Sequence, residues 1–349
     1  MWWLKRNGYG LTLAPRQTGK YSFMLKSTII RDAKTMSDQI THMPVDPGDV
    51  TGEEHWARRD DINLFLFRRY SPKARAASPD KPVLFLVHGS SFSARTAYDL
   101  DIPGKGDYSL MKTFAGLGYD VWTMDHEGYG KSSRTDGFST IADGVEDLKA
   151  AAPVVEAATG RGAFSFFGSS SGALRAGAFA NACPERVERM VLAALVWTGE
   201  GSPTLKKRAE RIDEWRATNR RVVDEAAYQG IFTRDVEGLT VAELPAAAAA
   251  AEIANGGGSV PNGTYIDMCI NLPVVDPLKI DCPVMIFRGD HDGIATDEDV
   301  LSFFTALPNK DKQLVMVTGQ AHNTTIGINR QRFWHALNGF LSIPPRIDN

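Results

Sequence analysis

One stretch constrains the fold of this chain more than any other. An apolar run at residues 164–167 leads directly into Gly-x-Ser-x-Gly at residues 168–172, and small residues follow at 173–182. The pattern predicts a buried strand, a sharp turn and a helix, the setting in which a serine is exposed at the carboxyl edge of a parallel sheet. Of the three consecutive serines, only Ser170 has glycine two positions before and two positions after it. We therefore predict that Ser170 is a nucleophile.

The two glycines of this motif have a predicted structural role. The turn residue is expected to adopt a strained backbone conformation, and a Cβ at Gly168 or Gly172 would collide with neighbouring backbone. Small Gly/Ser turns also join strands to helices where no chemistry occurs. The chemical interpretation therefore depends on the rest of the chain.

Strand and helix patterns alternate over most of the sequence. Continuous apolar runs, such as residues 83–87, are typical of strands buried on both faces of a parallel sheet. A strand at 62–68, hairpinned with the segment around 55–58, is predicted to come first, and residues 71–82 are predicted to form a loop. Further strands are predicted at 119–125, 187–196, 283–287 and 313–317, and helices at 108–117, 140–158, 297–307 and 331–341. This alternation predicts an α/β fold with a doubly wound, mostly parallel sheet.

Chemically suggestive side chains follow the predicted strands directly. Sites in sheets of this kind lie beyond the carboxyl ends of the strands, so these residues are expected on one rim. They are His88, Asp125, Ser170, Trp197, Asp292 and His322.

The strand rhythm stops between residues 198 and 280, where helical patterns occur and no clear strand is predicted. We predict three parts: an irregular N-terminal arm at 1–50, a core made of 51–197 and 281–349, and an inserted helical segment at 198–280. The weak periodicity of the arm raises the hypothesis that Met36 or Met43 is the true start. Mass spectrometry of the native N-terminus tests it.

Several of these motifs together resemble those of the α/β-hydrolase superfamily, in its triad order Ser…Asp…His. The resemblance covers about residues 53–341 and implies that 198–280 is a helical cap over the site. The motifs that carry it are His88-Gly89, the loop from Asp125 through Gly128-Tyr129-Gly130-Lys131-Ser132, Gly168–Gly172, Gly289-Asp290-His291-Asp292 and Gly319-Gln320-Ala321-His322.

The resemblance also implies roles for individual residues. His322 would take the proton of Ser170 and later deliver it to the leaving group. Asp292 fits the superfamily's spacing for the carboxylate that orients the imidazole, and Asp290 and Glu200 remain as alternatives.

Backbone amides would stabilise the negative charge that develops on the attacked carbonyl oxygen. The resemblance assigns this oxyanion hole to Ser171 and Ser90, with Ser91 as the alternative to Ser90. The substrate pocket is predicted to include Ser91, Phe92, Trp197 and Trp215. Phe232, Tyr265 and the loop at 92–107, with Tyr98 and Pro103, are further candidates for its walls.

Composition excludes several classes of function. A net charge of −3 over 349 residues gives no electrostatic reason to expect a nucleic-acid partner. The sequence has no apolar run long enough to span a membrane and no recognisable secretory signal, so we predict a cytoplasmic protein. The scattered Cys183, Cys269 and Cys282 predict neither a disulfide framework nor a metal site. No cofactor is expected, the partner is a small-molecule substrate, and the sequence predicts no oligomeric state.

The predicted function is a serine hydrolase that cleaves an ester, lactone or thioester of a small apolar substrate through an acyl-enzyme on Ser170. Two alternatives use the same three side chains: hydrolysis of a carbon–carbon bond, and acyl transfer. A third alternative, from a different class, is a non-catalytic ligand-binding protein on this fold.

Overall fold

The computed structural model describes residues 49–345 and residue 347. The predicted N-terminal arm, including Met36 and Met43, lies almost wholly outside the described residues. Those that are described all belong to one compact unit, and its division into a core and an insert stays a prediction. Within this part of the chain, no helix is both long and apolar enough to cross a membrane.

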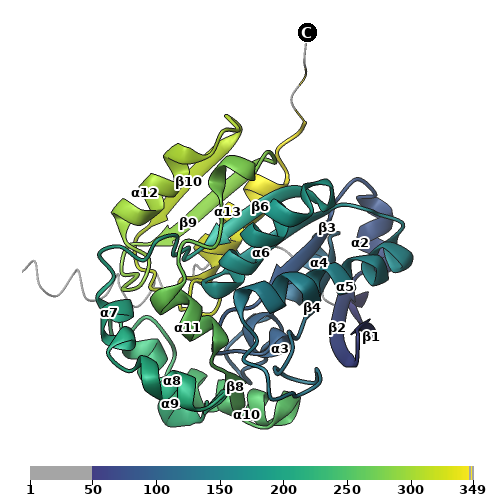
Figure 1. Ribbon diagram of the computed structural model, residues 1–349. Helices are drawn as coiled ribbons and strands as arrows, with labels where there is room; N and C mark the ends of the chain where they lie inside the picture. The colour runs from purple at the N-terminus through teal and green to yellow at the C-terminus, as the bar shows by residue number, and fades with distance from the viewer. Residues whose placement is uncertain (1–48, 346, 348–349) are drawn as a thin grey trace, which may run out of the picture. The chain divides into compact units, whose positions relative to one another are not determined.

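An eight-stranded sheet forms the centre of the unit (Figure 1). In spatial order its strands are β1 (Thr51–Arg59), β2 (Ile62–Tyr70), β4 (Asp120–Met124), β3 (Val83–Val87), β5 (Phe164–Ser169), β6 (Val187–Ala193), β9 (Val284–Gly289) and β10 (Lys312–Val317). The pairs β1–β2 and β2–β4 are antiparallel, and every other neighbouring pair is parallel. The predicted mostly parallel α/β sheet is confirmed, as is the hairpin at its start.

The sheet separates two hydrophobic cores, and β3 contributes to both. Residues 83, 85 and 87 pack into one core, while residues 84 and 86 pack into the other. All five are essentially inaccessible to solvent, which explains why this strand is a continuous apolar run and not an alternating one. Helices α5 (Ile141–Thr159), α6 (Ser171–Ala182) and α12 (Asp297–Ala306) cover the first face, and α4 (Leu110–Gly116) and α13 (Arg330–Leu341) cover the second.

Local signals explain where two helices lie. Helix α5 begins with a capping box, in which Thr140 and Asp143 bond to each other's backbone amides, and it ends at Gly160 with a φ of 70°. Residues 71–82, predicted as a loop, instead contain helix α2 (Pro72–Ala77). The Ser71 hydroxyl accepts a hydrogen bond from the Ala74 amide, and Pro72 fits the first helical position, so this short helix forms without an apolar face.

Between β6 and β9 the chain runs through a mainly helical segment, drawn at the lower left of Figure 1, which we call the insert. The prediction that it contains no strand was wrong, because β7 (Arg220–Val222) and β8 (Ser259–Pro261) form a small antiparallel sheet. Three residues are too few to show a strand period, and their partner is far away in the sequence. The helices of the insert are α7 (Pro203–Ala209), α8 (Ile212–Ala217), α9 (Glu225–Thr233), α10 (Leu244–Gly256) and α11 (Gly263–Ile270).

Candidate active site

Ser170 lies at a strained turn between β5 and α6. Its φ of 58° and ψ of −125° are unusual for a residue with a side chain. A Cβ at Gly168 would lie 2.3 Å from the Gly172 carbonyl oxygen, and a Cβ at Gly172 would lie 2.1 Å from the Val87 carbonyl oxygen. The predicted requirement for both glycines is confirmed, because any side chain there would displace the turn.

The structure brings Ser170, His322 and Asp292 into one chain of hydrogen bonds. His322 Nε2 lies 2.8 Å from Ser170 Oγ, and His322 Nδ1 lies 2.8 Å from Asp292 Oδ1. An ionised carboxylate only accepts hydrogen bonds, so the proton of the neutral imidazole belongs on Nδ1. Nε2 is then free to accept the hydroxyl proton of Ser170.

The carboxylate of Asp292 is buried, and its Oδ1 is well hydrogen-bonded, whereas its Oδ2 has no hydrogen-bond partner among the described residues. Its Oδ1 also accepts hydrogen bonds from the amides of Ile294 and Ala295, at 2.9 and 3.0 Å. Burial by itself would raise the pKa of Asp292, but the interaction with His322 and the hydrogen bonds from the amides of Ile294 and Ala295 together hold that pKa below its ordinary value. Asp292 is therefore ionised at neutral pH.

The two alternative acids lie elsewhere. Asp290 accepts a hydrogen bond from the Gln320 amide at 3.1 Å, and its carboxylate lies 3.5 Å from His291 Nε2. Glu200 is exposed at the surface. Neither carboxylate is in contact with His322.

Asp235, in the insert, holds the loop that carries His322. Its carboxylate accepts a hydrogen bond from the His322 amide at 3.1 Å and pairs with Arg234. A Cβ at Gly293, next to Asp292, would lie 2.6 Å from Asp235 Oδ1. Sequence reasoning missed Asp235, because no motif connects it to residues 292 and 322.

The loop that follows His88-Gly89 is fixed beside the Ser170 turn. Ser90 Oγ donates a hydrogen bond to Ser171 Oγ at 2.8 Å. The Ser90 carbonyl accepts from Tyr129 at 3.1 Å and from Arg221 at 2.5 Å, and the Ser91 carbonyl accepts from Tyr228 at 2.8 Å. Because Arg221 and Tyr228 belong to the insert, the geometry of this loop depends on both parts of the chain.

Hydrogen bonds of the His88 ring hold the start of this loop. Its Nε2 accepts a hydrogen bond from the His126 amide at 3.2 Å, so the proton of the neutral ring lies on Nδ1, which donates to the Gly89 carbonyl at 2.9 Å. Burial lowers the pKa of His88 well below its ordinary value, which keeps the ring neutral. These contacts give His88 a structural role, since its ring holds the backbone of this loop.

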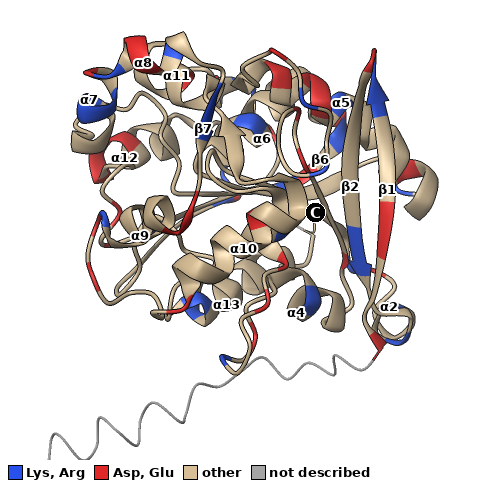
Figure 2. Ribbon diagram, turned by 90° about the horizontal axis from the view of Figure 1, so that it is seen from below, with Lys and Arg blue, Asp and Glu red and all other residues tan. Residues whose placement is uncertain are grey.

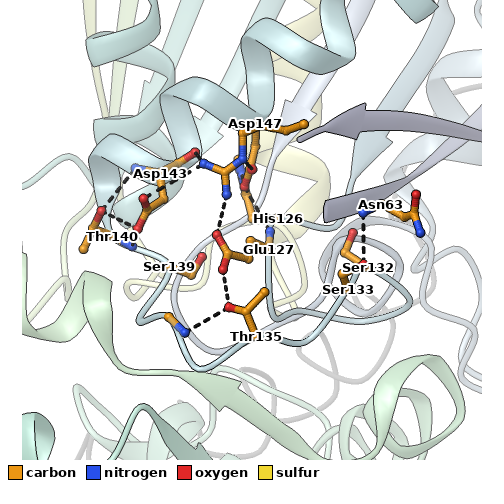
Figure 3. A network of polar contacts seen from close by, with 12 residues as sticks. Asn63, His126, Glu127, Ser132, Ser133, Thr135, Ser139, Thr140, Asp143 and Asp147 are labelled. Atoms are coloured by element: carbon orange, nitrogen blue, oxygen red, sulfur yellow. Dashed lines mark hydrogen bonds and ion pairs between the residues drawn. The ribbon is translucent and has the colours of Figure 1, made fainter. Parts of the chain in front are cut away.

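A buried polar network anchors His126 in turn (Figure 3). His126 Nδ1 lies 3.1 Å from Asp147 of α5, and Arg59 of β1 pairs with both Asp147 and Glu127. Burial raises the pKa of Asp147 to about 6. The network connects the loop after β4 to α5 and to the first strand.

A cavity of about 50 Å³ opens beside Ser170 and His322. Ser91, Phe92, Tyr98 and Tyr265, which the sequence indicates as candidates for the substrate pocket, line this cavity. A second pocket of about 360 Å³ lies outside it, and Trp215 lines that pocket instead of the inner cavity.

The structure does not bring Trp197 to the cavity. Its indole donates a hydrogen bond to the Val275 carbonyl at 3.0 Å and packs edge-on against Phe303 of α12. Its backbone amide is held by Asp299 at 2.8 Å. These contacts direct the side chain toward α12. Trp197, which was predicted to line the substrate pocket, therefore contributes to packing instead.

Two buried carboxylates hold the start of α3 (Ala94–Tyr98), next to the inner cavity. Asp125 accepts from the Ala94 amide at 2.7 Å, and Glu252 of α10 accepts from the Ser93 amide. Burial raises the pKa of Asp125 to about 6 and that of Glu252 to about 7, and the nearby Asp125 charge adds to the rise at Glu252.

The Glu252→Gln variant is expected to be more stable than the wild type above neutral pH. An unfolded glutamate releases its proton near pH 4.5, whereas Glu252 keeps it to about pH 7 in the folded state. Since the folded state binds more protons in this window, raising the pH through it lowers stability. The gain in unfolding free energy should be about 1–3 kcal/mol larger at pH 8 than at pH 5. Urea titrations at both pH values measure it, with the exposed Glu237→Gln as control. An equal gain at both would contradict the assignment.

Comparison with known proteins shows which family the sequence of this chain matches. The family model described as serine aminopeptidase, S33, matches residues 104–327, well over half of the chain. No curated protein sequence matches the chain at a significant level.

Solved structures share the fold at low sequence identity, which shows the fold and not an activity. A membrane phospholipase A, described as a bacterial virulence factor, is 17% identical with a TM-score of 0.61, over 92% of this chain and 94% of that chain. A thermophilic esterase from Thermogutta terrifontis is 18% identical with a TM-score of 0.59, over 83% and 98%. A 2-hydroxy-6-oxo-6-phenylhexa-2,4-dienoate hydrolase from Rhodococcus sp. strain RHA1 is 14% identical with a TM-score of 0.60, over 84% and 100%.

The family match and the shared fold agree with the motifs from which the resemblance was inferred. The chain therefore belongs to the serine aminopeptidase S33 family of the α/β-hydrolase superfamily, and it is a hydrolase.

Proposed function

We propose that this chain cleaves a carboxylic ester, lactone or thioester through an acyl-enzyme on Ser170. One observation carries the proposal: His322 lies 2.8 Å from both Ser170 Oγ and Asp292 Oδ1. A serine hydroxyl is a weak nucleophile until a positioned base can take its proton. The strained turn, the base and the ionised carboxylate together provide that activation.

The proposed reaction has two steps. Ser170 Oγ attacks the substrate carbonyl while His322 Nε2 takes the hydroxyl proton, and the charge of Asp292 stabilises the imidazolium that forms. The amides of Ser171 and Ser90 would stabilise the negative charge on the carbonyl oxygen. The leaving group departs with the proton from His322. A water molecule then attacks the acyl-enzyme by the same route and regenerates Ser170.

The insert is proposed to act as a cap over this site. Arg208, Ile231 and Tyr265 from the insert line the inner cavity together with Ser170 and His322. Substrate selection would then depend on the insert, and the proposed location remains cytoplasmic.

Labelling with a fluorophosphonate probe tests the proposal. We expect one covalent adduct in the intact mass, mapped by peptide sequencing to Ser170. Turnover is then measured on 4-nitrophenyl esters, lactones, acyl thioesters, an amino-acid 4-nitroanilide and a vinylogous diketone, and we expect an ester, lactone or thioester to be the best substrate. A folded protein that gives no adduct would favour the non-catalytic alternative. Labelling with turnover of the diketone alone would favour carbon–carbon bond hydrolysis.

A further inference from the structure

The pocket outside the inner cavity is strongly basic. We call this pocket of about 360 Å³ the vestibule; it shares Arg208, Ile231, Arg234 and Tyr265 with the inner cavity. Among the residues that the structure describes, no aspartate or glutamate lines either space. Figure 2 shows the basic residues of α7 and β7, in blue, on the insert. The cations that line the vestibule are Lys207, Arg208, Arg211, Arg221 and Arg234.

Only some of these charges are compensated within the described chain. Arg211 pairs with Glu214, and Arg234 forms a two-pronged pair with Asp235 at 2.7 and 2.9 Å. Arg221 donates to uncharged groups, including the carbonyls of residues 90 and 261. The guanidinium of Arg208 has neither a carboxylate nor a hydrogen-bond acceptor in the part of the chain that the structure describes.

Arg208 is nevertheless held in a defined place. Its guanidinium lies 3.6 Å from the centre of the Tyr265 ring, and that of Arg221 lies 3.7 Å from the same ring. These contacts hold the side chain in place and provide no carboxylate to pair with its charge. Arg208 is half-buried. Taking an unpaired charge partly out of water is costly, and desolvation lowers the pKa of Arg208 accordingly. A ligand that brings a negative charge would remove this cost.

The pKa of Tyr265 indicates a positive electrostatic potential where the vestibule meets the inner cavity. Burial would raise the pKa of its phenol, but the charges of Arg221 and Arg208 outweigh burial and lower that pKa to about 7. Its hydroxyl lies 3.3 Å from Ser91 Oγ, in the loop that follows His88-Gly89. An environment that favours a phenolate should also favour the anionic group of a ligand.

We propose that the substrate carries an anionic oxygen group, a carboxylate or a phosphate, which Arg208 binds at the junction of the vestibule and the inner cavity. The inference rests on the proposed function, since it assigns the substrate class of the same site. Arg208 lines the inner cavity together with Ser170 and His322, so the anion and the reacting carbonyl belong to one small molecule. A guanidinium fork matches both oxygen groups geometrically. This replaces the apolar substrate expected from the sequence.

Matched pairs of substrates test the proposal. The wild type should hydrolyse the 4-nitrophenyl monoester of glutaric acid with a higher kcat/KM than the neutral 4-nitrophenyl valerate. A second pair, butyrate esters of glycerol phosphate and of glycerol, places the charge on the alcohol side and separates phosphate from carboxylate. We expect Arg208→Gln to lower the preference for the charged member of at least one pair by about 10- to 100-fold. Arg208→Lys should retain part of it.

The control is Arg216→Gln, which removes an exposed cation of α8 that lines neither space. It should leave both preferences unchanged. Raising the ionic strength should weaken the preference in the wild type and have little effect in Arg208→Gln. Equal kcat/KM for charged and neutral members in the wild type, or an equal loss in Arg208→Gln and Arg216→Gln, would overturn the inference.

A binding measurement separates this inference from the proposed function. Calorimetric titration with glutarate and with inorganic phosphate needs no turnover, and at least one should bind the wild type and bind Arg208→Gln at least tenfold more weakly. Binding without fluorophosphonate labelling would retain the anion site and reject the acyl-enzyme. Labelling of Ser170 without anion binding and without a preference for charged substrates would retain the acyl-enzyme and reject the anion site.

Discussion

Replacing Ser170 by alanine is expected to lower kcat by about 10⁵- to 10⁶-fold while the protein remains folded. In enzymes with this arrangement, removal of the nucleophile costs about as much as removal of all three residues, because they act as a unit. The side chain of Ser170 makes its one described hydrogen bond to His322, at 2.8 Å. Its backbone, which sets the turn, keeps its bond to the Ala193 carbonyl at 2.9 Å in the variant.

The neighbouring serines provide the controls for this variant. Ser169→Ala and Ser171→Ala each remove a hydroxyl from the same turn, and we expect each to cost about tenfold or less. Steady-state kinetics and circular dichroism of all three variants measure activity and folding together. Comparable losses in the three, or near wild-type activity in Ser170→Ala, would show that another residue is the nucleophile.

Replacing Asp292 by asparagine is expected to lower kcat/KM by about 10³- to 10⁴-fold. Asp292 Oδ1 accepts from His322 and from the amides of Ile294 and Ala295. The oxygen of asparagine can keep these three hydrogen bonds, so the imidazole keeps its orientation. What is lost is the negative charge that stabilises the imidazolium. Steady-state kinetics across a range of pH measure the loss.

Asp290→Asn is the matched control, because it removes the same charge two residues away. Its carboxylate bonds to the Gln320 amide and has no contact with His322. We expect a change of less than about threefold, measured across the same pH range. A larger loss in Asp290→Asn than in Asp292→Asn would exchange the roles of the two acids.

The sequence predicted the sheet and the meeting of Ser170, Asp292 and His322 for one physical reason. Each of these residues follows a strand of the parallel part of the sheet, and parallel strands end at a common edge. The short apolar runs identify the strands, so the side chains after them can be placed without knowing any other contact. Their catalytic roles remain predictions, but their proximity is a property of the fold.

The same rule failed for Trp197, although that residue also follows a strand. The carboxylate of Asp299, about one hundred residues later, accepts a hydrogen bond from the backbone amide of Trp197. The indole of Trp197 packs against α12 and does not reach the inner cavity. The arginines of the vestibule were missed for a related reason. The packing of short elements brings together Arg208, Arg221 and Arg234. Elements this short show no sequence periodicity from which the contact could be predicted.

The insert has a consequence for how this protein can be altered. It supplies the Arg221 and Tyr228 hydrogen bonds to the loop at residues 90 and 91, the Glu252 bond to Ser93, and the Asp235 bond to His322. It is thus part of the scaffold that positions the reacting groups, and not a detachable module. Exchanging it for the insert of a relative would change selectivity and reactivity together, so a chimera would work only if the donor segment brought equivalents of these four side chains.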